Sequence, residues 1–347
     1  MRRSYHVLLL GLACLLLSTG TGGISWGQLP PGKADLHLRR AQDEGKRGNW
    51  DQVIDECTEV ILHDTNSSKL AEAYALRAQA WLQKQEWDLA IADCNEALRF
   101  NAKVAGVYIT RGHAWREKGD SAKAQADFNE AIRLSPRSAE AYYGRALTQS
   151  TRERTIADLT TALRLNPKYA EAYYRRAQAL WWEEDTDKAI ADYTEAIRLN
   201  PQFTEAYRGR GRAWEKKGNL DQAIADYSVA IRLQPSDPAT YFLRGDVWNK
   251  KGDLDRAIAD YSEVIRLKPK ETRAYNQRAL AWLKKGDRAK AKADYDKLRQ
   301  IAPFAIENEL RRALEEEASF PPLLPERKVD EKKPAKDGVS PRRSQRS

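Results

Sequence analysis

The sequence has few residues of the kinds that build disulfide frameworks, metal centres or membrane spans. Its 347 residues include three cysteines and four histidines. Two cysteines outside the N-terminal segment, Cys57 and Cys94, are too few for a disulfide-dense scaffold, so we interpret both as small buried hydrophobic residues. No uninterrupted apolar run reaches the roughly 20 residues that cross a bilayer, which excludes a polytopic membrane protein. Glycine and proline occur at ordinary frequency, which excludes collagen-like and wholly disordered chains.

The motifs of a catalytic or metal site are also missing from the sequence. No histidine stands at a metal-ligand spacing from a cysteine or from another histidine. Neither a Gly-rich phosphate loop nor a nucleophile elbow occurs. We therefore expect a protein that is not an enzyme, without a catalytic residue, a bound metal or a cofactor.

The formal charge of +9 is concentrated at the two ends of the chain. Residues 1–27 carry +2 and residues 320–347 carry +4, which leaves only +3 for the long central part. Such a densely charged but nearly balanced surface does not favour nucleic acid as a partner. Residues 320–347 are rich in proline, lysine and arginine and poor in aliphatic residues, so this basic tail is predicted to be disordered.

The N-terminus has the pattern of an export signal. Arg2 and Arg3 precede an apolar stretch from Val7 to Leu17, and small residues follow. This order is typical of a secretory signal peptide. We predict that residues 1–27 are the signal, cleaved after its last residue, and that residues 28–33 are a linker. The protein is then exported, either periplasmic or secreted; an uncleaved signal would instead tether it to the membrane.

A pattern of about 34 residues recurs eight times between residues 34 and 305. The copies begin at residues 34, 71, 105, 139, 170, 204, 238 and 272. Position 8 of every copy is small, which allows two helices to approach closely. A recurring glycine at position 15 can end one helix, the Asp or Asn after it can cap the next, and a proline at position 32 can stop that second helix. Each copy is thus predicted to be an antiparallel helix hairpin that completes its core by stacking on its neighbours.

The recurring residues match a known repeat. In the copy that begins at residue 204 they are Tyr207, Arg210, Gly211, Trp214, Ala223, Tyr227, Ala230 and Pro235. This arrangement resembles the tetratricopeptide repeat family, and the resemblance covers residues 34–305. It implies an all-α fold, a right-handed α-solenoid superhelix of antiparallel helix hairpins. Residues 306–319, which carry apolar side chains on one helical stripe, are predicted to be a C-terminal capping helix.

Arginine at position 7, where the family commonly has leucine, is matched by an acidic residue at position 23 in all eight copies. The two positions lie level across the hairpin because they are equally far from the turn. Their register survives in the copy at residue 139, which lacks three residues and the Gly-Asp turn. We interpret them as structural ion pairs; the alternative is a stripe of arginines that binds phosphates or another polyanion. The predicted pairs are Arg77–Asp93, Arg111–Asp127, Arg145–Asp158, Arg176–Asp192, Arg210–Asp226, Arg244–Asp260 and Arg278–Asp294.

The resemblance also implies that the first helix of each hairpin lines a concave groove. The partner-binding residues that it implies are Ile109, His113, Tyr143, Tyr174, Gln178, Arg208, Arg212, Phe242 and Asp246. This mixture of aromatic and polar side chains suits an extended peptide or a partner helix. Alternatively, some of the aromatic residues pack against the neighbouring repeat. The family's clamp for a C-terminal carboxylate is not expected, because no copy has lysine at position 5 or asparagine at position 9, and Asn276 stands alone at position 5.

These patterns predict a scaffold or adaptor that binds a protein or peptide in its groove. The alternative is a binder of anionic polymer or of the membrane surface, acting through the arginines, the basic tail or an uncleaved signal. A regulatory subunit of an enzyme complex is a third reading that no residue favours. Salt separates the first two, because binding to a polyanion should collapse between about 50 and 200 mM salt.

Overall fold

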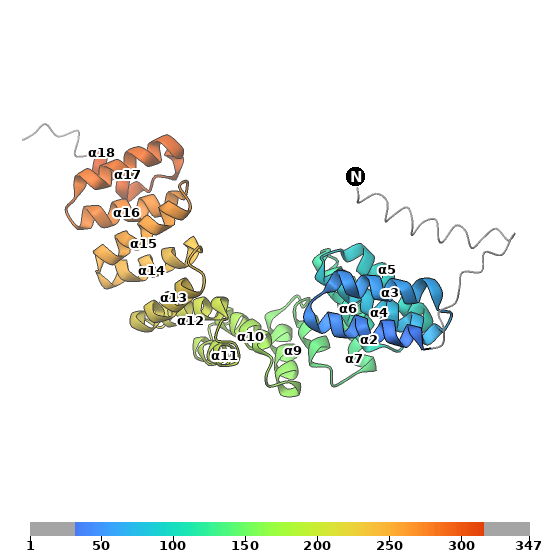
Figure 1. Ribbon diagram of the computed structural model, residues 1–347. Coiled ribbons are helices and arrows are strands. Elements are labelled where there is room, and N and C mark those ends of the chain that lie inside the picture. Colours follow the sequence, from blue (N-terminus) through green and yellow to red (C-terminus); the bar gives the residue numbers. More distant parts are fainter. Residues whose placement is uncertain (1–31, 316–347) are drawn as a thin grey trace, which may run out of the picture. The chain divides into compact units, whose positions relative to one another are not determined.

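The computed structural model describes residues 32–315, and in this range every regular element is a helix (Figure 1). The helices of the first four hairpins are α2 (Lys33–Arg47), α3 (Trp50–His63), α4 (Ser67–Gln83), α5 (Trp87–Phe100), α6 (Ala105–Glu117), α7 (Ser121–Leu134), α8 (Ala139–Ala146) and α9 (Arg152–Leu165). Those that follow are α10 (Ala170–Trp182), α11 (Thr186–Leu199), α12 (Thr204–Lys216), α13 (Leu220–Leu233), α14 (Pro238–Lys251), α15 (Leu254–Leu267), α16 (Thr272–Lys284), α17 (Arg288–Ile301), the short 3₁₀ helix η1 (Pro303–Ala305) and α18 (Asn308–Glu315). The predicted signal and basic tail lie outside the described residues.

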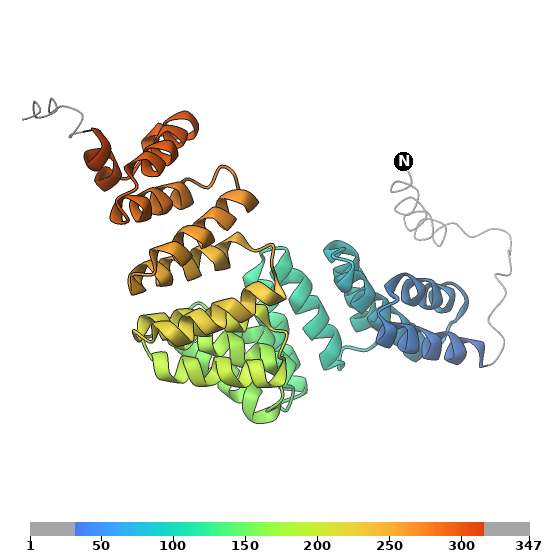
Figure 2. The same cartoon turned by 60° about the vertical axis from the view of Figure 1, so that its left-hand side comes forward.

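Successive helices pair as hairpins, each with a first helix, helix A, and a second helix, helix B (Figure 2). The chain divides into two units, residues 1–234 and 235–347. The described part of the first unit holds six hairpins, and that of the second holds two hairpins and α18. Within each unit, helix B of one hairpin packs on helix A of the next. The expected all-α array of stacked helix hairpins is confirmed.

Two of the predicted boundaries differ from the helices. Helix α2 begins at Lys33, so the last residue of the predicted linker is already helical. Helix α4 begins at Ser67, four residues before the predicted start of the second copy, because the three extra residues between these copies extend it at its N-terminal end. The amide side chain of Asn66 caps this extension by accepting hydrogen bonds from the backbone N–H groups of Ser68 and Lys69.

The turn glycines end helix A in the left-handed conformation, as their position predicts. Gly218 and Gly252 have φ angles of 81° and 82°, where a side chain would be strained. The carboxylate of Asp253 then accepts a hydrogen bond from the backbone N–H of Arg256 and so caps helix B. Asn219 was expected to cap in the same way, but within the described chain its side chain makes no such bond.

Glycine at position 8 makes room for a large ring at position 24 in three hairpins. A Cβ atom on Gly211 would lie 2.6 Å from the ring of Tyr227, and the glycines that face Phe128 and Tyr261 are similarly crowded. Alanine stands at position 8 in the three hairpins where position 24 is cysteine or leucine. It also stands there in the hairpins of Tyr193 and Tyr295, so a ring at position 24 does not always require glycine at position 8.

Helix α18 covers the end of the last hairpin. Ile306 and Leu310 are buried in one cluster with side chains of α16 and α17. The amide of Asn276 fixes the connection, donating to the carbonyl of Ala305 at 2.7 Å and accepting from the N–H of Glu307 at 3.1 Å. The stripe predicted for residues 306–319 does pack on the last repeat, although the helix begins only at residue 308 and residues 316–319 lie outside the described chain.

Candidate functional site

The seven predicted Arg–Asp pairs all form two hydrogen bonds. In each, Nε and Nη2 of the arginine donate to the two carboxylate oxygens of the aspartate at 2.6–3.0 Å. The guanidinium also lies 5.4–5.8 Å from the ring centre of the tyrosine at position 4 of the same helix. Position 7 thus joins helix A to helix B through charge, hydrogen bonds and a cation–π contact.

A third bond of the same arginine joins neighbouring hairpins. In six hairpins Nη1 donates to a polar side chain at position 25 of the preceding hairpin at 2.7–3.1 Å. These acceptors are Thr58, Asn95, Asn129, Thr160, Thr194 and Ser262. The sequence analysis missed this position, although the recurrence of Thr, Asn or Ser there is visible in the sequence. Guanidinium groups held by three partners within the array are poorly placed to bind a polyanion.

Burial decides how much stability is lost when one partner of an Arg–Asp pair is removed. The aspartates are 5–6% exposed, whereas Arg77 is the one arginine of the seven that is itself buried. The hydrogen bond to Asp127 raises the pKa of Arg111. Burial raises the pKa of Asp93 against the opposing effect of Arg77. The cost of removing both groups from water therefore offsets part of the attraction between arginine and aspartate. The larger loss of stability would come from removing the arginine and leaving the buried aspartate without a partner.

The first hairpin departs from this arrangement. Arg40 is 55% exposed at its side chain and only approaches Glu56, at 4.0 Å. Glu56 instead accepts a hydrogen bond at 2.5 Å from Nδ1 of His37, which stands where the other hairpins have tyrosine.

Four of the predicted groove residues meet at one cavity of about 210 Å³ in the first unit. Tyr174 and Gln178 come from α10, and Arg208 and Arg212 come from α12. Further lining residues are Trp181, Trp182, Tyr193, Glu205 and Gly209. The groove site is defined here as these nine residues. It lies between the helices A of two successive hairpins, α10 and α12.

Aromatic rings build one wall of the groove site. The ring of Tyr174 lies 4.8 Å from Phe203 and 5.9 Å from Tyr193, and its hydroxyl accepts a hydrogen bond from Nε2 of Gln178 at 2.9 Å. Burial raises the pKa of Tyr174, so it remains a neutral phenol at pH 7. Gly209 leaves the space for this wall, because a Cβ atom there would lie 2.5 Å from the ring of Tyr193.

Two adjacent tryptophans form the outer edge of the groove site. Their rings meet edge to face at 4.8 Å, and Trp182 is 62% exposed. Nε1 of Trp181 is buried and has no hydrogen-bond partner among residues 32–315. The ammonium group of Lys216 lies 5.5 Å from the centre of the Trp181 ring. This edge thus presents a large apolar surface, formed by the exposed Trp182.

The charges at the groove site are mainly positive. Arg208 and Arg212 line it, against one acid, Glu205. Arg212 is exposed and takes part in no hydrogen bond or salt bridge within the described chain. An anionic group beside the aromatic wall would therefore be favoured by charge.

The other predicted groove residues lie elsewhere. Ile109 and Phe242 are only 6% and 9% exposed, so the structure places them in the cores of their hairpins, where they offer a partner little surface. Tyr143 packs on Tyr169 at 4.7 Å. Asp246 accepts a hydrogen bond from the hydroxyl of a buried tyrosine, Tyr261, at 2.8 Å. The alternative that some of the aromatic residues pack against the neighbouring repeat fits Tyr143 and Phe242, whose clusters include Ala172 and Ala274 of the following hairpins.

His113 sits against the core rather than in open groove. Its ring meets Phe128 edge to face at 5.1 Å. Burial lowers the pKa of His113 to about 4, and the positive charge of Arg116 acts in the same direction. The imidazole is therefore neutral at pH 7 and resembles a packed aromatic residue more than a charged contact.

Residues 32–315 contain neither a cluster of metal ligands nor a helix of membrane-spanning length and apolarity. No group of three His, Cys, Asp or Glu side chains in this range is arranged to hold a metal ion. None of the helices in this range is long and apolar enough to cross a membrane.

Family models match much of the repeat region. A tetratricopeptide repeat model matches residues 109–154 and 183–238, and a TPR repeat model matches residues 245–286. No curated protein matches the sequence. The matched stretches fall on the hairpins described above.

Solved structures share the fold at low sequence identity. Pseudomonas aeruginosa pilF is 17% identical over 61% of this chain and 97% of its own, with a TM-score of 0.52. The APC/C hetero-tetramer Cut9–Hcn1 is 17% identical over 83% of this chain and 57% of its own, with a TM-score of 0.53. YrrB, described as a TPR protein with an unusual peptide-binding site, is 21% identical over 52% and 95%, with a TM-score of 0.47. The family models identify residues 109–154, 183–238 and 245–286 as tetratricopeptide repeats, and the helix hairpins of residues 32–315 have the same architecture throughout.

Proposed function

We propose that this protein is a non-enzymatic scaffold that binds a segment of a partner protein at the groove site. The observation that carries the proposal is the meeting of aromatic surface and unpaired positive charge there. Trp182 exposes most of its surface, and Arg212 has no partner within the described chain. Exposed aromatic residues and arginines are the side chains that dominate binding energy at protein interfaces.

The lining indicates the chemistry of that segment. An extended peptide or a helix could lay an apolar side chain on Tyr174 and Trp182 while an acidic side chain meets Arg212. An acidic segment that carries at least one large apolar residue would satisfy both features.

The geometry argues against a polyanion as the main ligand. The seven arginines of the ladder direct their guanidinium groups into aspartates of their own hairpins. The basic tail, the predicted signal and hence the proposed export of the protein concern residues outside the described range. Binding to polymer or membrane surface would have to rest on those segments.

The groove can be tested by affinity capture with the full chain as bait. We expect wild-type protein to recover a specific partner from an extract of its own cells. Tyr174→Ala and Arg212→Glu should each reduce that recovery at least about tenfold, because each removes a contact of hot-spot size. The recovery by wild type should persist between 50 and 200 mM salt, over which binding to a polyanion would collapse.

Arg232→Glu is the matched control, since Arg232 is an exposed arginine in the same unit, at the end of α13. It makes the same change of charge away from the groove site and should recover the partner as wild type does. Equal recovery by wild type, Tyr174→Ala and Arg212→Glu would refute the groove as the binding site. Loss of recovery by Arg232→Glu to the same degree would point to net charge instead.

A further inference from the structure

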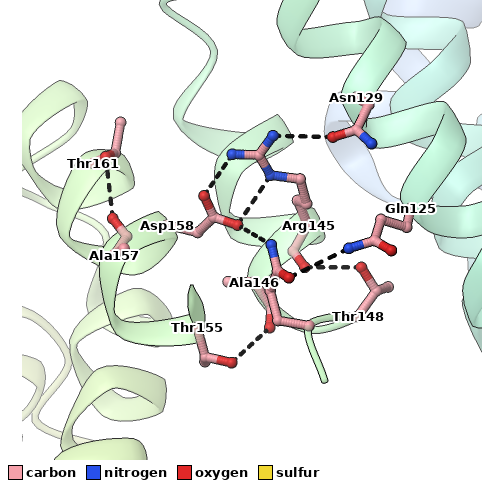
Figure 3. Close-up of polar contacts among 10 residues, drawn as sticks. Gln125, Asn129, Arg145, Ala146, Thr148, Thr155, Ala157, Asp158 and Thr161 are labelled. Carbon is pink, nitrogen blue, oxygen red and sulfur yellow. Dashed lines mark hydrogen bonds and ion pairs between the residues drawn. The ribbon is translucent and has the colours of Figure 1, made fainter. Parts of the chain in front are cut away.

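A hollow of about 340 Å³ in the fourth hairpin marks a place where a tryptophan is missing. Five of the hairpins have tryptophan at position 11: Trp81, Trp115, Trp214, Trp248 and Trp282. The fourth hairpin has Gln149 there, and its helix α8 ends early, at Ala146. The hollow is lined by Gln125, Asn129, Arg145, Gln149, Arg154, Ala157 and Asp158, most of which are drawn in Figure 3.

Gln149 keeps a contact with the aspartate at position 23 without filling the volume of a tryptophan. In the second hairpin, Trp81 lies close enough to Asp93, the aspartate at position 23, to lower the pKa of that carboxyl. In the fourth, Nε2 of Gln149 donates to Oδ2 of Asp158, also at position 23, at 2.7 Å. A glutamine side chain is much smaller than an indole, so the position keeps its polar contact and loses its bulk.

The neighbouring hairpin has changed at the same junction. Position 21 is isoleucine in every hairpin except the third, which has Gln125, and the last, which has lysine. At the preceding junction Trp115 packs against a core that contains Ile91. Here instead Nε2 of Gln125 donates to Oε1 of Gln149 at 3.3 Å (Figure 3). An apolar contact on both sides of the junction has thus been replaced by a polar pair beside open space.

Arg154 lines the hollow at position 19, where the cation of other hairpins covers a tryptophan ring. At position 19, Lys123 and Lys290 lie 4.2 Å from the centre of their own hairpin's tryptophan ring, and Arg256 lies 4.6 Å from its ring. Arg154 has this position in the fourth hairpin, and among residues 32–315 it contacts no aromatic ring. The elements that surround an indole in other hairpins are therefore present here around an open space.

We propose that the hollow receives one tryptophan side chain from a partner polypeptide. The inference rests on the proposed function in one respect, that the ligand belongs to a protein. The indole would lie beneath Arg154, as Trp115, Trp248 and Trp282 lie beneath the cation at position 19 of their own hairpins. Its N–H would point to Asp158, whose Oδ1 accepts one bond, from Nη2 of Arg145, and has a lone pair left. A phenylalanine would leave this acceptor unsatisfied, which is why the site favours an aromatic residue with a donor.

The probe for this site is N-acetyl-L-tryptophanamide, followed by saturation-transfer NMR and titration on the full chain. We expect a dissociation constant of about 1 mM, as suits a single side chain in an open site. Arg154→Gln should weaken binding about three- to fivefold by removing the cation–π contact. Arg164→Gln changes an exposed arginine further along the same helix and should leave binding unchanged. N-acetyl-L-leucinamide should bind at least about tenfold more weakly.

Substitutions that fill the hollow with a larger side chain of this protein are the most direct control. Gln149→Trp supplies the side chain that five of the other hairpins have and should abolish binding of the probe. Ala157→Leu narrows the hollow from α9 and should do the same if the first variant does not fold. The proposal is overturned if the tryptophan probe does not bind at millimolar concentration, if the leucine probe binds as well, or if a folded filling variant still binds it. None of these results depends on the groove site, whose partner capture would be unaffected.

Discussion

Arginine at position 7 contributes to the array through three different neighbours. It stacks on a tyrosine of its own helix, pairs with an aspartate across the hairpin, and donates to a polar residue of the preceding hairpin. Leucine, which the family commonly has there, could contribute packing only. The arginine therefore brings a geometric requirement, since its planar fork fits a carboxylate in one orientation. The register between helices A and B is set by that fit as well as by apolar packing.

We predict that Arg210→Ala lowers the free energy of unfolding by about 2–4 kcal/mol. The variant leaves Asp226, which is 6% exposed, without its charge partner. Arg212→Ala removes an exposed arginine from the same helix and should change stability by less than about 0.5 kcal/mol. Urea denaturation followed by circular dichroism measures both, and heparin affinity should be unchanged in Arg210→Ala. Lost heparin binding with unchanged stability would instead favour the polyanion reading.

At the scale of the element, the turns of most hairpins depend on the backbone conformation of a single residue. Seven of the eight turns place one residue in the left-handed conformation at the end of helix A. Five of these residues are glycine, but Gln85 and Glu184 adopt φ angles of 62° and 65° with side chains present. The fourth hairpin has a turn that is three residues shorter and needs no left-handed residue, and Thr151 caps its second helix. The fold therefore tolerates local backbone strain at two turns, because stacking on both sides holds the hairpin closed.

We predict that Glu184→Gly raises the free energy of unfolding by about 0.5–1 kcal/mol. Removing the side chain relieves the strain of a left-handed backbone, and the greater freedom of glycine in the unfolded chain offsets only part of that gain. The reverse change in the next hairpin, Gly218→Glu, should destabilise by a similar amount. Thermal unfolding of the two variants should thus shift in opposite directions, and a fall in the midpoint of Glu184→Gly would contradict the assignment of strain.

At the scale of the molecule, each hairpin depends on the ones beside it. No hairpin can bury both of its apolar faces alone, so an end of the array needs a cover. In the second unit α18 provides it, with Leu310 fully buried against the last hairpin. In such an array the effect of a substitution should decline along the chain rather than spread evenly.

We predict that Leu310→Ala costs about 2–4 kcal/mol locally, because it leaves a cavity at a fully buried site. Hydrogen exchange should become faster in α16, α17 and α18 and remain unchanged in α4 and α5, which lie far along the array. Arg312→Ala, an exposed change on the same helix, should leave exchange as in wild type. Equal acceleration in every hairpin would contradict this nearest-neighbour picture.

Much of the fold could be predicted because the same types of residue recur at the same positions in eight copies of the repeat. The small residue at position 8, the turn glycine and the proline after helix B act over a few residues, so their effects are visible without coordinates. The level register of Arg145 and Asp158 was visible for the same reason, since deletion of three residues moved the turn and kept the pairing. Contacts between residues that are far apart in the sequence could not be predicted. One example is the side chain of Asn276, which forms hydrogen bonds to the connection before α18.

The sequence by itself determined the class of fold, the hairpin register and the ion pairs, because these follow from spacing within one repeat. Only the tertiary structure decided which residues remain available to a partner. Ile109 and Tyr174 occupy the same repeat position, yet the first is buried and the second lines a cavity. Ile109 packs in one cluster with Phe128 and Ala141, whereas Tyr174 lies beside Tyr193 and Phe203 at the wall of the cavity. Exposure is a property of the packed array, since each surface is what the adjacent helices leave uncovered.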